Sequence, residues 1–207
     1  MKRGFFISFE GIDGCGKSTM LHLVEQDLQQ RGYAVLATRE PGDSDFGRAF
    51  RAMLLDSEFG AMDIKTETLL YAADRAQHVN EIIRPALDRG WIVLSDRYID
   101  STIAYQGGGR GLDSHFLQLL NNFATGGLMP DLTLYLRYPS QGMEDRLRGR
   151  KDRVEQETKD FFVRVGDTYE QLAEQFAARI AIIDATQKIP VVFAEISAKI
   201  AERLSWK

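Results

Sequence analysis

The chain has 207 residues, of which 44 % are hydrophobic, and it carries a net charge of −4. This length favours one compact domain, and the acidic balance disfavours a protein that binds nucleic acid through a broad basic surface. The single cysteine, Cys15, excludes an internal disulfide and favours a reducing, cytoplasmic location. No apolar run approaches the ~18 residues that a membrane span requires, so we expect no membrane association.

Five short apolar runs rich in β-forming residues are predicted strands. They cover residues 5–9, 33–38, 91–96, 132–136 and 180–184. Four of them are continuously apolar, which is typical of parallel strands that are covered on both faces. Helical patterns lie between the strands, so we expect right-handed βαβ crossovers in a doubly wound α/β fold.

The segment after the first predicted strand fits the phosphate-loop pattern G-x-x-x-x-G-K-[ST]. It consists of Gly11, Ile12, Asp13, Gly14, Cys15, Gly16, Lys17 and Ser18, with Thr19 following. Glycines let backbone N–H groups turn towards phosphate oxygens, and a helix that begins near Lys17 adds the positive end of its dipole. Lys17 is expected to reach the β- and γ-phosphates of a nucleoside triphosphate, and the Ser18 hydroxyl to bind Mg²⁺. Cys15 is expected to fill space rather than to react.

Four amphipathic helices are predicted, at residues 17–31, 69–83, 161–180 and 191–204. Gly32 is expected to end the first of them in a left-handed cap. Pro85 is expected to break or kink the chain after the second, because proline has no N–H and clashes with the preceding turn.

Asp96 closes the third predicted strand and is followed at once by Arg97. A doubly wound sheet presents its ligands at the carboxyl ends of its strands. We therefore expect Asp96 to hold Mg²⁺ from the side opposite Ser18, and Arg97 to bind phosphate with its charged fork of donors.

A basic cluster occupies residues 137–153 of this acidic chain. It contains Arg137, Arg146, Arg148, Arg150, Lys151 and Arg153. A solvated helix face is one interpretation of these charges. We favour a mobile lid over approximately 142–156, because arginines neutralise the charge of a transferred phosphoryl group. A closed lid also excludes water from the reaction.

Among proteins with a phosphate loop, we compare GTPase switches, motor or transporter ATPases and small kinases, and the sequence favours a small kinase. No asparagine is followed by lysine, so the guanine-reading element of GTPase switches is missing. The chain also leaves little room for the extra signature segments of motor or transporter ATPases. The expected fold is therefore a P-loop NTPase-like three-layer α/β sandwich, with a five-stranded parallel sheet flanked by helices, one domain over 1–207 and a mobile lid.

At this point the sequence resembles the thymidylate kinase family almost from end to end. The resemblance rests on FEGIDG (9–14), TREPG (38–42), LLYAADR (69–75), DRY (96–98), ST (101–102), YQGGGRG (105–111) and RGRKDRVE (148–155). It implies transfer of the ATP γ-phosphate to thymidine monophosphate (dTMP), which gives ADP and thymidine diphosphate.

The resemblance also implies how the acceptor is held. Arg39 and Arg97 would clamp its 5′-phosphate, and Asp13 would approach the 3′-hydroxyl and help to order Mg²⁺. Tyr71 would stack on thymine, and Arg75 would donate to a base carbonyl. Ser101, Thr102, Tyr105 and Gln106 would complete the pocket for base and sugar.

The family differs in where its catalytic arginine lies. Gly14 occupies the loop position at which some members have a basic residue, so this sequence resembles the bacterial type that places arginines in the lid. Arg148 is then the first candidate for the transferred phosphoryl group and Arg153 the second, with Asp152 and Glu155 orienting them. The resemblance further implies that adenine lies between Arg146 and the stretch that contains Asp184 and Ala185.

Three points stay open at this stage. Asp43 follows Gly42 where the family usually repeats glycine, which puts the loop that carries Arg39 in question. A homodimer is implied by the resemblance, with the helix around 64–83 at the interface. A deoxynucleoside kinase, or a nucleotide sensor without catalysis, would share the phosphate loop.

Overall fold

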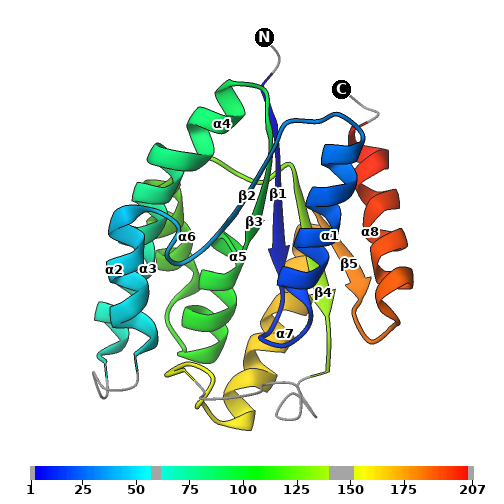
Figure 1. Cartoon of the computed structure of the whole chain (residues 1–207). Helices are drawn as coiled ribbons and strands as arrows, with labels where there is room; N and C mark the ends of the chain where they lie inside the picture. The colour runs from blue at the N-terminus through cyan, green and yellow to red at the C-terminus, as the bar shows by residue number, and fades with distance from the viewer. Residues whose placement is uncertain (1–2, 57–61, 140–151, 205–207) are drawn as a thin grey trace.

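We describe a computed structural model of the chain in which residues 3–56, 62–139 and 152–204 are described. Five parallel strands form one sheet in the order β2-β3-β1-β4-β5 (Figure 1). The strands are β1 (Phe5–Glu10), β2 (Val35–Arg39), β3 (Ile92–Asp96), β4 (Leu132–Arg137) and β5 (Ile180–Asp184). All five predicted strands are thus confirmed, with ends that differ by no more than two residues.

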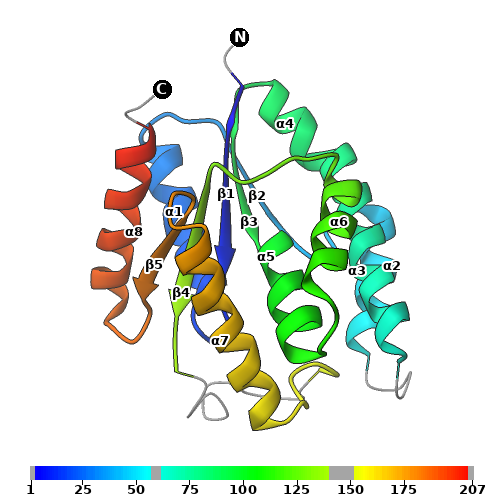
Figure 2. The ribbon, with the colours of Figure 1, turned by 180° about the vertical axis from the view of Figure 1, so that it is seen from behind.

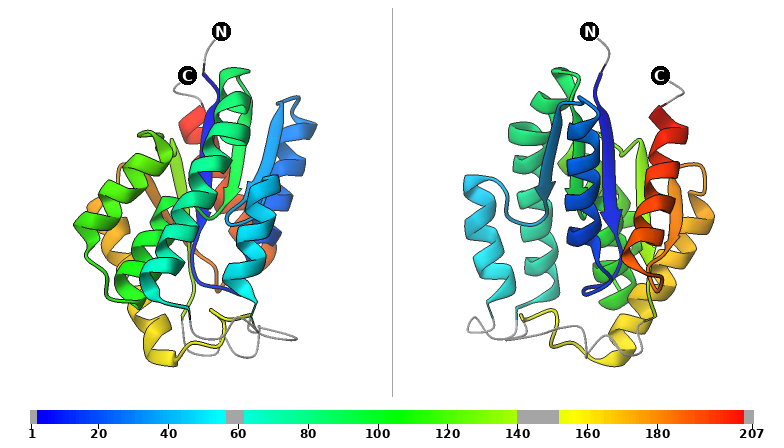
Figure 3. Two further views of the ribbon diagram at one scale, coloured as in Figure 1. Left: turned by 90° about the vertical axis from the view of Figure 1, so that its left-hand side faces the viewer. Right: turned by 45° about the vertical axis from the view of Figure 1, so that its right-hand side comes forward.

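Helices cover both faces of the sheet. They are α1 (Lys17–Gln30), α2 (Asp45–Leu55), α3 (Ile64–His78), η2 (Val79–Ile83), α4 (Arg84–Asp88), α5 (Ile99–Thr102), η3 (Ile103–Gly109), α6 (Ser114–Thr125), α7 (Lys159–Gln175) and α8 (Ile189–Leu204), where η marks π-helical turns. Helices α1 and α8 pack together on one face, while the column from α3 to α4, together with α5, η3 and α7, lies on the other (Figures 1 and 2). The turned views in Figure 3 show the three layers, which confirms the predicted sandwich.

The hydrophobic core follows the alternation of side chains along β1. Phe5, Ile7 and Phe9 point to the face covered by α1 and α8, whereas Phe6 points to the opposite face and packs with Ile83 of η2. All of these side chains are buried. Burial on both faces explains why the central strands are continuously apolar in sequence.

Helix α1 starts and ends at glycines. Gly16, its N-cap, has φ 102°, a left-handed conformation that glycine adopts without a Cβ clash. At the other end, Gly32 has φ 86°, and the N–H groups of Gly32 and Tyr33 donate to the carbonyls of Gln29 and Leu28. This pair of bonds is a Schellman motif, so the predicted left-handed cap is confirmed.

The sequence predicts that Pro85 breaks or kinks the second helix, and the structure shows that it does not break it. The helix begins at Ile64, passes through the π-helical turns of η2 and continues as α4 to Asp88. A π-turn shifts the hydrogen-bond register by one residue, and Pro85 lies in the first turn after it, where a missing N–H costs little.

Helices α2, α5 and α6 are missing from the sequence-based prediction, although two of them carry clear end signals. The Ser44 side chain caps α2 by accepting from the Gly47 N–H, and the Asp113 side chain caps α6 by accepting from the Phe116 N–H. Gly126, with φ 56°, ends α6. These signals are readable from sequence.

Segment η3 approaches α7 very closely. A Cβ at Gly108 would lie 2.0 Å from the Thr168 hydroxyl oxygen, so only glycine fits there. The Arg164 guanidinium donates to the carbonyls of Gly108 and Gly109 and so fixes the contact. As a result, α7 brings Tyr169 against the carboxyl edge of the sheet.

The strands' carboxyl ends lie together at the end of the molecule opposite the two chain termini (Figure 1). Glu10 ends β1, Arg39 ends β2 and Asp96 ends β3. Among the helices that the structure describes, none has the length and apolar character to cross a membrane.

Candidate functional site

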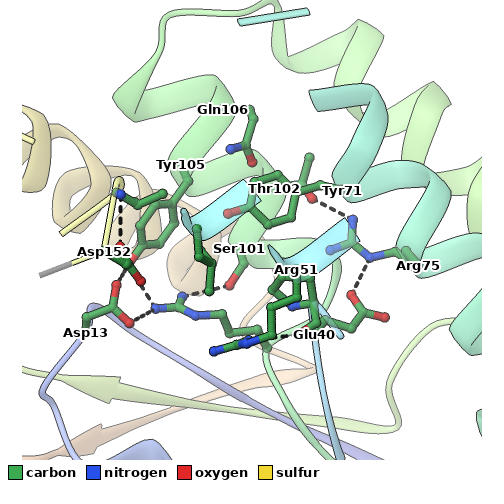
Figure 4. A pocket seen from close by; sticks show the side chains of 14 residues that line it. Asp13, Glu40, Arg51, Tyr71, Arg75, Ser101, Thr102, Tyr105, Gln106 and Asp152 are labelled. Atoms are coloured by element: carbon green, nitrogen blue, oxygen red, sulfur yellow. Dashed lines mark hydrogen bonds and ion pairs between the residues drawn. The ribbon is translucent and has the colours of Figure 1, made fainter. Parts of the chain in front are cut away.

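Two cavities lie side by side at this carboxyl edge. One has an open volume of about 580 Å³ and is lined by Asp13, Glu40, Pro41, Arg51, Leu55, Tyr71, Arg75, Arg97, Ser101, Thr102, Tyr105, Gln106, Asp152 and Val154 (Figure 4). The other, of about 840 Å³, is lined by Asp13, Gly14, Gly16, Lys17, Ser18, Thr19, Arg39, Glu40, Arg51, Asp96 and Arg97. We call them the acceptor cavity and the phosphate-loop cavity. They share Asp13, Glu40, Arg51 and Arg97, which form the wall between them.

The phosphate loop is held in shape by Lys17. Its ammonium donates to the carbonyls of Gly11 (3.0 Å) and Ile12 (2.9 Å) and lies 3.9 Å from the Asp13 carboxylate. The side chain is only 6 % exposed. The N-cap Gly16 offers no side chain to the first N–H groups of α1, which leaves them available to an anion.

Ser18 and Asp96 meet across the phosphate-loop cavity. The Ser18 hydroxyl donates to the Asp96 carboxylate at 2.6 Å, although the residues are 78 positions apart. A hydroxyl and a carboxylate are oxygen ligands that suit a hard cation such as Mg²⁺. In residues 3–56, 62–139 and 152–204, no group of three or more His, Cys, Asp or Glu side chains is placed to hold a metal. An ion at this pair would thus take its other ligands from water and phosphate.

Arg97 is the centre of the wall between the cavities. Its guanidinium donates to Asp13 (2.6 Å), Ser101 (3.0 Å) and Tyr105 (3.0 Å). Arg97 also has φ 72°, an uncommon conformation for a residue with a Cβ and one that often marks functional sites. Burial acts to raise the pKa of Asp13, but the charges of Arg97 and Lys17 outweigh it and hold this pKa at about 2. Asp13 is therefore ionised.

Glu10 is linked to Arg97 through Ser101, which contacts both side chains. Its Oε2, the Ser101 hydroxyl and the Tyr169 hydroxyl lie within 2.6 to 2.9 Å of one another, and Oε1 accepts from the Tyr98 N–H. The Ser101 and Tyr169 hydroxyls each donate to Oε2. Burial, reinforced by the charge of Asp100, raises the pKa of Glu10 to about 7, although these two hydrogen bonds act to lower it. Near neutral pH, Glu10 is therefore present in both its protonated and its ionised form.

This raised pKa predicts a pH-dependent stability. The ordinary pKa of Glu10 in the unfolded chain, 4.5, is lower than its folded value of about 7, so the folded state binds the proton more tightly. The free energy of unfolding should fall between pH 4.5 and 7 by an amount on the order of 1 to 3 kcal/mol from this group. Urea unfolding of wild type and Glu10→Gln at pH 5 and pH 7.5 measures the effect.

The difference between wild type and Glu10→Gln separates the contribution of Glu10 to the pH dependence from that of the other carboxylates. We expect the wild type to lose more stability than Glu10→Gln over this range, whereas Glu202→Gln, which changes an exposed glutamate of α8, should behave like wild type. Equal losses in all three proteins would show that Glu10 is ionised throughout.

The far wall of the acceptor cavity is built on α3, α5 and η3. Arg75 is 2 % exposed, and its guanidinium donates to Glu40 (2.8 Å), Thr102 (2.5 Å), Asn121 (2.7 Å) and the Tyr98 carbonyl (3.0 Å). These bonds use four of its five N–H hydrogens, which fixes the plane of the group.

Two further side chains line this wall. Tyr71 lies one turn before Arg75 on α3, and both reach the cavity (Figure 4). Gln106 is buried and donates to Glu67 at 3.0 Å. The structure therefore gathers every residue that the sequence predicted for the base and sugar.

Arg51 is a site residue that the sequence-based prediction missed. It comes from α2 and lines both cavities, and its guanidinium donates to the Pro41 carbonyl at 2.8 Å. Burial and the neighbouring charge of Arg39 lower the pKa of Arg51. Two arginines close enough to repel one another attract an anion, such as a phosphate, between them. Recognising α2 from its Ser44 cap would have placed Arg51 near Arg39.

Arg153 does not line either cavity. It donates to the Glu67 carboxylate (2.6 Å) and to the Leu54 carbonyl (2.9 Å), and so ties the segment after residue 151 to α2 and α3. The Asp152 side chain, expected to orient this arginine, instead accepts from the backbone N–H groups of Val154 and Glu155. Arg146 and Arg148, and most of the predicted lid, lie outside the described residues.

Of the residues predicted to hold adenine, Asp184 and Ala185 lie at the same edge of the sheet but line neither cavity. Asp184 is exposed at the end of β5 and accepts from Thr186 and Gln187, while Ala185 is buried. Cys15 is also buried, and burial raises the pKa of its thiol. A thiol of this kind is a poor nucleophile, which supports the expectation that it fills space.

Comparison with known proteins completes the description of the site. The family model described as thymidylate kinase matches residues 9–196. A thymidylate kinase of Desulfovibrio desulfuricans is 50 % identical over 191 residues, which cover 88 % of both chains, and one of Geobacillus thermodenitrificans is 44 % identical over 205 residues, covering 97 % of this chain and 91 % of the relative.

A solved structure supports the same assignment. The crystal structure of thymidylate kinase from Ehrlichia chaffeensis superposes with a TM-score of 0.81 at 32 % identity, and covers 96 % of this chain and 99 % of that one. The chain belongs to the thymidylate kinase family.

Proposed function

We propose that the protein transfers the γ-phosphate of ATP to dTMP, with the donor in the phosphate-loop cavity and the acceptor in the neighbouring one. The observation that carries this proposal is the shared wall. Two cavities that meet at Asp13, Arg51 and Arg97 can hold two nucleotides with their phosphates facing each other. A protein that only bound or hydrolysed ATP would have no need of the second, base-sized cavity.

Within this proposal the chain works by positioning and by charge. Lys17 would leave the loop carbonyls to contact the β- and γ-phosphates, while the N–H groups at the start of α1 hold the same oxygens. Arg97, Arg51 and Arg39 would hold the acceptor phosphate in line with the donor. Asp13 keeps Arg97 in place and would contact the sugar. The acceptor phosphate is already anionic, so no side chain must act as a strong base.

Mg²⁺ is part of the proposal. The Ser18 hydroxyl and the Asp96 carboxylate, which lie in contact, are the oxygen donors that would hold the ion, with water and phosphate oxygens as its other ligands. When bound, the ion supplies charge neutralisation at the β- and γ-phosphates. Arg148, the first of the candidate arginines in the sequence, would add to this charge.

The first experiment is a parallel assay of ADP release. Mg-ATP is supplied with dTMP, dUMP, dCMP, dGMP, AMP or thymidine, and each reaction is repeated with excess EDTA. We expect a large rate with dTMP, a smaller one with dUMP, none with the purines, and complete loss with EDTA that excess Mg²⁺ restores.

Each other outcome selects a different function. Turnover of thymidine but not of dTMP would indicate a deoxynucleoside kinase. Turnover of another monophosphate would keep the kinase and overturn the role given to Tyr71 and Arg75. ATP binding without any acceptor-dependent release would indicate a nucleotide sensor.

We also propose that the protein forms a homodimer in the cytoplasm. Exposed apolar side chains gather on α3 and α6, which pack against each other. They are Leu69, Phe116, Leu119 and Phe123, the last of them 85 % exposed. A second copy could cover this surface. Sedimentation at micromolar concentration should give the mass of a dimer for wild type and of a monomer for Phe123→Glu; a monomeric wild type would overturn the dimer.

A further inference from the structure

Asp43 is the one position at which the loop after β2 differs from what the family resemblance predicts. The loop is pinned at nearly every residue. The Glu40 N–H donates to the Asp96 carbonyl (2.9 Å), the Pro41 carbonyl accepts from Arg51, and the Gly42 N–H donates to Asp74 (3.1 Å). Arg39, which lines the phosphate-loop cavity, lies at the start of this loop.

Asp43 begins a chain of polar contacts that crosses the molecule from this loop to the acceptor cavity. The Thr38 hydroxyl donates to Asp43 Oδ2 (2.5 Å) and lies 2.6 Å from His78 Nε2. His78 Nδ1 lies 2.9 Å from Glu40 Oε1, and Glu40 Oε2 accepts from Arg75 Nε at 2.8 Å. Thr38, Glu40, Arg75 and His78 are all buried.

Each member of this chain is held by its neighbours. The Thr38 hydroxyl has one hydrogen, which it donates to Asp43, and its oxygen lies against the His78 ring. Burial acts to raise the pKa of Glu40, but Arg75 and His78 outweigh it and lower the pKa, so Glu40 is ionised and accepts from Arg75.

Asp43 lies at the outer end of this chain and gives the Thr38 hydroxyl its acceptor. Thr38 and His78 are buried, and buried polar groups need such partners. A change at Asp43 therefore frees the Thr38 hydroxyl to turn and disturbs its contact with His78, which in turn contacts Glu40.

We propose that Asp43 is a positioning residue for acceptor binding, which ties the loop that carries Arg39 through Thr38, His78 and Glu40 to Arg75. The chain of contacts joins the phosphate side of the site to the base side, and so keeps the spacing that one nucleotide must span. This inference rests on the proposed function, because it assumes that dTMP occupies the acceptor cavity.

The test compares Asp43→Asn and Asp43→Gly with Asp45→Asn, a control two residues away on the exposed start of α2. Wild-type turnover of dTMP is measured first, since its absence would overturn the proposed function itself. We then expect the KM for dTMP to rise about threefold in Asp43→Asn and about tenfold in Asp43→Gly, the scale of a lost charge-assisted contact. The kcat and the KM for ATP should stay within about twofold of wild type, as expected when uniform binding is lost.

Equilibrium binding separates positioning from a general loss of structure. Thymidine lacks the 5′-phosphate and touches only the base side, so its affinity should change by less than about twofold in Asp43→Gly while that of dTMP falls about tenfold. Equal weakening of both ligands, or an unchanged KM for dTMP in both Asp43 variants, would overturn the proposal.

Discussion

Lys17→Met should lower kcat by about 100- to 1,000-fold, the scale seen when one preorganised donor to a transition-state charge is removed. Methionine is an unbranched side chain one atom shorter than lysine, and its apolar character suits a site that is 6 % exposed. It cannot donate to the loop carbonyls or to phosphate, so the charge that develops on the transferred group loses its nearest cation. Steady-state ADP release at saturating ATP and dTMP measures the effect.

Two comparisons make this result specific. Lys199→Met, on the outer side of α8, should keep wild-type turnover, and circular dichroism should show that Lys17→Met is folded. If Lys17→Met turned over at a rate close to wild type, Lys17 would have to be removed from the catalytic residues, and the phosphate loop would act through its backbone alone.

Arg97→Ala should lower kcat/KM for dTMP by about 100- to 1,000-fold, and Arg97→Lys should recover only a small part of the loss. The guanidinium holds Asp13, Ser101 and Tyr105 at once. A lysine ammonium is a point charge that cannot form this planar fork. Alanine also leaves Asp13 without its main partner in a half-buried position, so the wall between the cavities loses its shape as well as its charge.

The kinetics of the two variants test the role of the fork. The measurement is kcat and KM for dTMP and for ATP in Arg97→Ala and Arg97→Lys, with Arg31→Ala, an exposed arginine at the end of α1, as the control. If the KM for ATP changed as much as the KM for dTMP, Arg97 would have to be assigned a role in binding the donor, and not in binding the acceptor alone. Full activity in Arg97→Lys would show that charge alone is needed.

Arg153 shows what a charge pattern leaves open about a single side chain. The sequence groups it with Arg148, and a charge count cannot tell the two apart. The structure gives Arg153 partners on α2 and α3, at Leu54 and Glu67, which are far away in sequence. Arg148 stays the first candidate for contact with the phosphoryl group and Arg153 the second.

The sequence by itself determined the fold class and most of the site. Apolar runs, four of them continuous, predicted the five strands; the three central ones are buried on both faces, which leaves no room for polar alternation. The phosphate loop was identified by glycines and a lysine at fixed local spacing, from Gly11 to Ser18. Gly32 ended α1 as expected, since a left-handed cap is a local property of the backbone.

The tertiary structure alone decided what depends on distant contacts. Whether Pro85 ends a helix depended on the π-turns before it and on the packing of that column against β1 and β3. Arg51 joined the site because α2 folds over the loop after β2. The roles inferred for Glu10 and Asp43 rest on Tyr169 and His78, which lie 159 and 35 positions away. Sequence patterns record local geometry and burial, whereas hydrogen-bond partners and shared protons are set only when separate elements pack together.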